Sequence, residues 1–188
     1  KTGLPFIKNE LLPRAAAMTS LNRRDIGTGE ARQRISRSID MLYWIDHQWW
    51  VPAALHWLSV KGADHAETAR FFDLLDRMTY ILRIASVDPT DQELRYLRLL
   101  DEIDKAPNVE AIQWLQIERK LLGEALNNLR SRTFYAKRCH ALVLRRISVH
   151  IDQSRDPGPV DGENVTVEHI LPRKPDAGDV NLTVSTVI

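Results

Sequence analysis

The stretch "DHAETARFFDLLDRMTYILRIA", residues 64–85, decides the fold of this chain. Its large apolar side chains recur every three or four positions, which is the spacing that gathers side chains on one face of an α-helix. These residues are Phe71, Leu74, Leu75, Met78, Ile81 and Leu82. The stretch therefore predicts a long amphipathic helix, with His65, which follows Asp64 near its start, as a neighbour of the cap.

Similar spacing extends on both sides of this stretch and predicts a chain of helices. The expected helices cover residues 27–45, 88–103, 108–129 and 133–151. In 88–103 the pattern predicts an apolar stripe of Leu94, Leu97 and Leu100. Residues 4–21 predict a helical pair broken near Pro13, because an interior proline removes a backbone hydrogen bond. We therefore expect a mainly α protein with an all-helical domain over residues 1–152.

Composition sets limits on the class of protein. The chain has 188 residues, of which 44% are hydrophobic, enough for a packed core. A single cysteine, Cys139, excludes an internal disulfide framework and a cysteine-rich zinc site, which favours a cytoplasmic location. No apolar run approaches the length of about 18 residues that crosses a membrane. Because the chain begins with Lys1, we expect it to be part of a longer protein.

The aromatic stretch "WIDHQWWVPAALHW", residues 44–57, allows two interpretations. Its tryptophans could stack on a nucleobase. In a helical domain, however, tryptophans more often fill the core, because each buries a large apolar area. We therefore expect these tryptophans to be core residues.

Charge is unevenly distributed along a chain whose net charge is only +1. Residues 119–146 hold eight Lys and Arg against one acid, whereas residues 61–118 hold seven bases against twelve acids. A basic segment can bind phosphates, or it can be an ordinary solvated helix surface. The candidate nucleic-acid-binding residues in this segment are Arg130, Arg132, Lys137, Arg138, Arg145 and Arg146.

The pattern changes at Asp152, where "DQSRDPGPVDGEN" is rich in turn-forming residues and indicates a domain boundary. "VTVEHI", residues 165–170, then predicts a short strand ended by Pro172. Glu168 and His169 stand side by side at its end. An imidazole can take a proton from water, and a carboxylate can hold a hard cation, so the pair suits phosphodiester cleavage. A Glu-His pair also occurs by chance in many proteins.

The residues around this pair strengthen the interpretation that it is catalytic. Glu168 to Pro172 reads "EHILP" and is followed by "VNLTV" at residues 180–184. This pattern resembles the HNH (His-Me finger) motif, and most closely the C-terminal domain of GmrSD-type modification-dependent restriction endonucleases. The helical stretches "FFDLLDRMTYILRI" and "RTFYAKRCHALVLRRISVHI" resemble the helical region of that family. Ssp-type anti-phage effectors that sense DNA phosphorothioation share this architecture and are one candidate subgroup.

The resemblance implies a role for each matched residue. His169 corresponds to the general base, Glu168 to a metal-binding carboxylate, and Asn181 to the asparagine that supports the loop and positions the histidine. Arg173 and Lys174, which follow the motif, join the candidate nucleic-acid-binding residues. The implied metal is Mg²⁺ or Mn²⁺. The family's final helix, with a further metal ligand, has no match here, so residues 153–188 predict a partial, apparently incomplete ββα-metal finger.

The sequence thus predicts the C-terminal nuclease part of a restriction or anti-phage defence protein, an HNH-type endonuclease that nicks DNA. Its expected partners are DNA and an N-terminal NTPase or sensor domain. The alternative is a non-catalytic helical module that binds DNA or a partner and carries a degenerate HNH remnant. A plain interaction scaffold is a third hypothesis.

Overall fold

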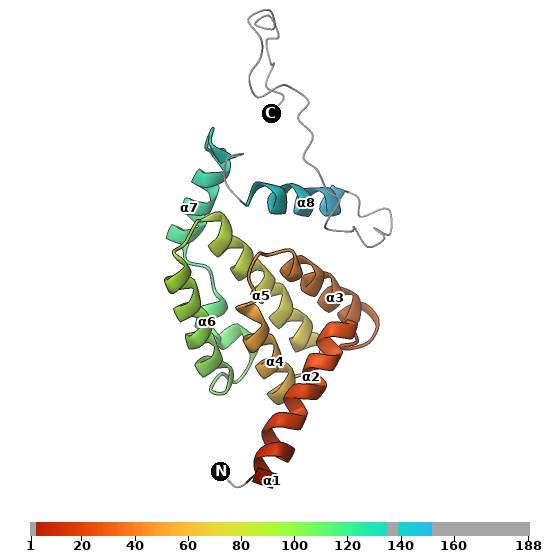
Figure 1. The fold of residues 1–188 in the computed structure, drawn as a ribbon. Coiled ribbons are helices and arrows are strands. Elements are labelled where there is room, and N and C mark those ends of the chain that lie inside the picture. Colours follow the sequence, from red (N-terminus) through yellow and green to blue (C-terminus); the bar gives the residue numbers. More distant parts are fainter. Residues whose placement is uncertain (1–2, 135–138, 152–188) are drawn as a thin grey trace, which may run out of the picture. The chain divides into compact units, whose positions relative to one another are not determined.

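A computed structural model describes residues 3–134 and 139–151, and the structural statements below concern these ranges. The chain divides into two units, Lys1–Ser148 and Val149–Ile188, and the contacts discussed here lie within the first. The described part is mainly helical, as expected, and contains no strand (Figure 1). Its elements are α1 (Gly3–Phe6), η1 (Ile7–Leu11), α2 (Leu12–Arg23), α3 (Gly29–Tyr43), α4 (Trp50–Val60), α5 (His65–Ile84), α6 (Pro89–Ile103), η2 (Val109–Ala111), η3 (Gln113–Leu115), α7 (Arg119–Arg130) and α8 (His140–Ile151).

Helix α5 is the central element, and α3, α4 and α7 pack against it (Figure 1). Its start is fixed by Asp64, whose side chain accepts hydrogen bonds from the backbone amides of Ala66 at 3.0 Å and Glu67 at 2.9 Å. Such a cap satisfies amides that have no partner inside the helix. The amphipathic helix predicted over 64–85 is therefore confirmed. Its buried apolar residues include Phe71, Leu74, Leu75, Met78 and Leu82.

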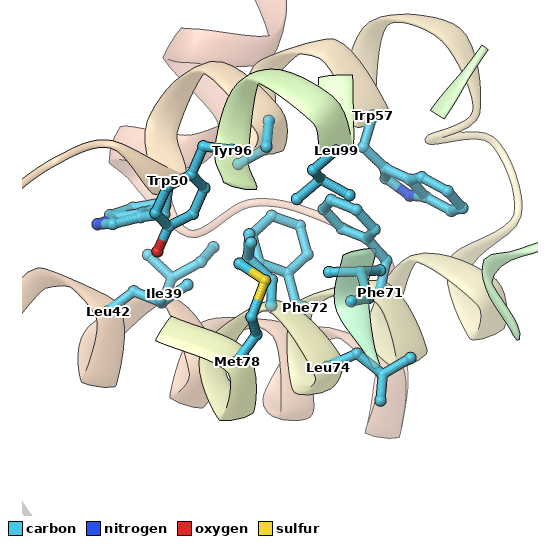
Figure 2. Packing of buried hydrophobic residues seen from close by; sticks show 14 of the residues in the cluster. Ile39, Leu42, Trp50, Trp57, Phe71, Phe72, Leu74, Met78, Tyr96 and Leu99 are labelled. Atoms are coloured by element: carbon cyan, nitrogen blue, oxygen red, sulfur yellow. The ribbon is translucent and has the colours of Figure 1, made fainter. Parts of the chain in front are cut away.

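Aromatic side chains from α4 and α5 form the centre of the core (Figure 2). The rings of Trp57 and Phe71 stack with centroids 4.3 Å apart, and Phe72 meets the edge of Phe71 at 5.7 Å. Trp50 and Trp57 have no exposed surface. The expectation that the tryptophans of this stretch serve the core is confirmed for these two residues. The rings also position α4 against α5, since aromatic pairs prefer offset or edge contacts.

Of the three leucines in the stripe predicted on α6, only Leu100 packs against the core. Leu94 and Leu97 are 44% and 53% exposed, whereas Tyr96 and Leu99 are buried together with the polar residues Gln92 and Arg95. The helix is rotated so that a charged residue faces inward. Burial of a charge is tolerable only when it is paired and hydrogen-bonded.

Arg95 meets that condition through the loop after α6. Its Nε donates to the carbonyl of Trp114 at 3.0 Å, and Nη1 donates to both carboxylate oxygens of Glu118 at 3.2 Å. Nη2 donates to the carbonyl of Gln116. The continuous helix expected over 108–129 is therefore wrong. The chain instead forms the two short turns η2 and η3, and α7 begins only at Arg119. At Trp114 and Gln116, carbonyls that a helix would use internally accept hydrogen bonds from Arg95.

The expected break at Pro13 is also wrong. The chain stays helical from Gly3 to Arg23, with a π-helical turn, η1, just before the proline. In this wider turn the amide of Leu12 donates to the carbonyl of Ile7, five residues back. Pro13 then lies in the first turn of α2, directly after this wider turn. Leu4, Phe6, Ile7, Leu11 and Leu12 are exposed along this helical segment.

The rotation of α6 can be checked with two leucines that lie two positions apart. We expect Leu99→Ala to lower the free energy of unfolding by about 2–5 kcal/mol, because the side chain is fully buried and leaves a cavity. Leu97→Ala should change it by less than about 0.5 kcal/mol, as for an exposed residue. Urea unfolding followed by circular dichroism measures both. Equal losses in the two variants would contradict the orientation of α6.

Candidate functional site

Helix α8 is the described element closest along the chain to the "EHILP" segment. It is held against α5 by an ion pair between Arg146 and Asp76. Nη1 of Arg146 donates to Oδ1 of Asp76 at 2.8 Å, and Nη2 donates to Oδ2. This two-pronged geometry fixes orientation as well as distance, because the guanidinium and carboxylate planes must match.

Asp76 lies inside the domain, with 4% of its surface exposed. Burial raises the pKa of its carboxyl above the ordinary value, and the hydrogen bonds and positive charge of Arg146 oppose that rise. The pKa of Arg146 is raised: burial would lower it, but the hydrogen bonds and charge of Asp76 outweigh that effect. Each group thus stabilises the charged form of the other, and the loss of either leaves an unpaired charge.

Two aromatic side chains, Tyr80 and Trp44, also contact α8. Together with Asp76 they form the surface against which α8 packs, called here the seat of α8. The Arg146 guanidinium lies 4.3 Å from the ring centroid of Tyr80. The hydroxyl of Tyr80 donates to the carbonyl of Leu142, and burial raises the pKa of that hydroxyl further above neutral. The neighbouring Arg145 lies 5.3 Å from the ring centroid of Trp44. Cation–aromatic contacts therefore tie α8 to α5 and to the end of α3.

The predicted nucleic-acid-binding residues divide into three groups. Arg130 and Arg132 are exposed at and just after the end of α7. Arg145 and Arg146 lie on α8, where Arg146 has the packing role described above. The remaining four lie outside the described residues: Lys137, Arg138, Arg173 and Lys174. Binding of DNA by any of these residues stays a prediction.

The predicted catalytic and metal-binding residues Glu168, His169 and Asn181 lie outside the described residues, as does the whole expected ββα finger. Within residues 3–134 and 139–151 there is no group of three or more His, Cys, Asp or Glu side chains that could hold a metal ion. Over the same ranges, no helix has the length and apolar character needed to span a membrane. Nuclease activity stays a prediction from the motif.

Sequence reasoning missed Asp76 and Tyr80, although a signal for Asp76 was present. Asp76 stands between Leu75 and Met78 on the apolar face of α5, where an acidic residue is out of place. A carboxylate at such a position needs a cation from elsewhere in the fold. The sequence does not say which of its many arginines supplies that cation.

A pocket of about 370 Å³ lies between α6, η3 and α7, apart from the seat of α8. Its apolar lining includes Leu82 and Leu121, and at its edge the Arg98 guanidinium lies 4.7 Å from the ring centroid of Trp114. Both signs of charge line it equally, since Arg95, Arg98 and Lys120 face Asp91, Glu118 and Glu124. This balance gives the pocket no clear preference for an anion, and none of the predicted site residues lines it.

Comparisons of this chain with protein-family models, with curated proteins and with solved structures found no match.

The Asp76–Arg146 pair predicts a sharp stability effect. Arg146→Met keeps much of the side-chain volume but leaves the buried Asp76 carboxylate unpaired. We expect a loss of about 3 kcal/mol in the free energy of unfolding, the lower end of the range for buried pairs, because 37% of the Arg146 side chain is exposed. The exposed Arg132→Met is the matched control and should change stability by less than about 0.5 kcal/mol. Equal values in chemical denaturation would contradict the ion pair.

The same variant should have a characteristic pH dependence. Without Arg146, the folded-state pKa of Asp76 lies further above its unfolded value, because only the effect of burial remains large. A carboxyl whose pKa is raised by folding favours the folded state at low pH and loses that contribution as pH rises through the folded pKa. We therefore expect the stability gap between wild type and Arg146→Met to be smaller at about pH 4 than at pH 7. A gap that is constant with pH would exclude Asp76 as its source.

Proposed function

We propose that this protein cleaves DNA and is the nuclease part of a restriction or anti-phage defence system, with His169 as the general base. The observation that carries the proposal is the order of residues in the motif. Glu168, His169, Ile170, Leu171 and Pro172 are followed by "VNLTV" at residues 180–184. The match to an HNH-type site lies in this whole pattern, because a lone Glu-His pair occurs too often by chance.

The chemistry follows from the residue types. The neutral imidazole of His169 takes a proton from a water molecule, and the water oxygen then attacks the phosphorus of the backbone while the P–O bond to the leaving sugar breaks. Asn181 supports the position of the imidazole by hydrogen bonding. A divalent cation, Mg²⁺ or Mn²⁺, held with the help of the Glu168 carboxylate would neutralise charge that builds up on the phosphate.

The helical domain supports this proposal through α8. The chain passes from α8, whose last described residue is Ile151, directly into the segment that holds the motif. The Asp76–Arg146 pair and the Tyr80–Leu142 hydrogen bond fix α8 on the central helix. A nuclease segment gains from a fixed attachment point, because catalysis requires the base and the scissile phosphate to be held in a defined geometry.

A non-catalytic DNA-binding module is the second candidate function. Arg130 and Arg132 favour it, since both belong to the basic segment 119–146 and both are exposed. A module of this kind would bind duplex DNA through phosphates, with affinity that falls steeply as salt increases. It would not depend on His169.

Plasmid nicking in the presence of Mg²⁺ or Mn²⁺ separates the two functions. We expect His169→Ala to reduce the nicking rate by a factor of roughly 10² to 10⁴ while DNA binding is retained, because only the proton-transfer step is removed. His65→Ala is the matched control: His65 is exposed at the start of α5, outside the motif, and its loss should leave the rate unchanged. DNA binding without nicking in the wild type would favour the second candidate. Equal nicking by wild type and His169→Ala would overturn the assignment of the base.

A further inference from the structure

Two arginines that the charge pattern did not single out are exposed on α3 and α5, the helices whose residues contact α8. Arg37 lies on α3 and Arg77 lies on α5. Within residues 3–134 and 139–151, neither guanidinium has a carboxylate within ion-pair distance. The other four arginines of α3 and α5 are all paired. The pairs are Arg32 with Asp25, Arg34 with Asp73, Arg70 with Glu110, and Arg83 with Asp46.

The two arginines lie on neighbouring stripes of packed helices. On α3, Arg37 has helical spacing with Arg34 and Trp44, and on α5, Arg77 has the same spacing with Asp73 and Tyr80. The two stripes are joined at Asp73, which pairs with Arg34 and accepts a hydrogen bond from Ser38 at 3.1 Å. Helix α8 contacts both stripes at their other end, through Trp44 and Tyr80.

The local charge balance makes this face positive. The carboxylates nearest to the two arginines along α3 and α5 are Asp40, Asp73 and Asp76. They are already paired with Arg24, Arg34 and Arg146, respectively. The charges of Arg37 and Arg77 remain uncompensated by the described residues. An exposed guanidinium group without a carboxylate partner is well suited to bind phosphate oxygens through paired hydrogen bonds. Packed helices lie about 8–10 Å apart, so two long side chains on adjacent helices can reach separate phosphates of one backbone.

We propose that Arg37 and Arg77 form a phosphate-binding surface for duplex DNA beside α8. This inference rests on the proposed function, since DNA is the substrate that a nuclease motif on the segment after α8 requires. The surface would bind the backbone without base preference, because phosphates are the same at every step. It would hold DNA next to the helix from which the motif segment continues along the chain.

Fluorescence anisotropy with a labelled DNA duplex tests the surface over a series of salt concentrations. The double variant Arg37→Gln/Arg77→Gln should bind at least about tenfold more weakly at low salt. The slope of log affinity against log salt should fall by about one per arginine, as expected when phosphate contacts are lost. The charge-reversing variant Arg37→Glu/Arg77→Glu should bind more weakly still. Thermal unfolding of each variant checks that the fold is kept, which the exposure of both residues leads us to expect.

Arg119→Glu is the matched control. Arg119 is exposed and has no ion-pair partner among the described residues, but it starts α7 beside Glu118, which faces α6 rather than α3. Arg119→Glu changes the net charge by two units, as Arg37→Gln/Arg77→Gln does, but its affinity should stay within about twofold of wild type after allowing for that general change in charge. The proposed surface would be contradicted if Arg119→Glu and Arg37→Gln/Arg77→Gln lost the same amount of DNA affinity. It would also be contradicted if the wild type did not bind DNA at low salt.

The experiment separates this inference from the function on which it rests. Nicking that depends on His169, together with unchanged binding in Arg37→Gln/Arg77→Gln, would keep the nuclease and reject the surface. Binding that depends on Arg37 and Arg77, in a protein that never nicks, would keep the surface and reject the nuclease. In that case the helical domain would be a DNA-binding module.

Discussion

A carboxylate buried in the central helix must meet a cation, and in this protein Asp76 meets Arg146, 70 residues further along the chain. The penalty for burying an unpaired charge is larger than the gain from most single contacts, so this requirement restricts where α8 can lie. The pair also brings Arg146 over the ring of Tyr80 and places the backbone of Leu142 within reach of the Tyr80 hydroxyl. The attachment of the last described helix thus depends on one buried acid.

The same principle operates at Arg95, with the charges reversed. There a buried guanidinium binds two loop carbonyls and the Glu118 carboxylate, and the chain after α6 gives up helical hydrogen bonds to satisfy it. In both places a polar residue inside the core decides the path of a distant segment. Apolar packing alone would tolerate several positions of these segments, because burial of apolar area has no direction. A hydrogen-bonded ion pair requires a defined distance and orientation, so it excludes the other positions of these segments.

The ion pairs of the domain also determine which of its arginines are available to bind phosphates. A count of Lys and Arg along the sequence directs attention to the segment around Arg145 and Arg146, but Arg146 is committed to Asp76. Arg77 comes from the acid-rich stretch 61–118, and Arg37 lies outside the basic segment 119–146. Both remain without an ion-pair partner among the described residues after the neighbouring pairs have formed. The electrostatic surface of the domain is therefore set by which charges remain after packing. This selection underlies the proposed DNA surface, while the catalytic proposal depends on the motif at residues 168–184.

The sequence by itself determined the helical class, the position of the central helix and the use of Trp50 and Trp57 in the core, since apolar periodicity and aromatic size act locally. It also supplied the motif with Glu168, His169 and Asn181, which lies outside the described residues and stays a prediction. The tertiary structure decided that Leu97 is exposed while Arg95 is buried, that residues 108–118 leave the helix, and that Pro13 is accommodated by a wide turn. It also decided which arginines pair with acids. These features depend on contacts between segments far apart in the chain, and the energy of a buried charge is set by a partner that periodicity cannot identify.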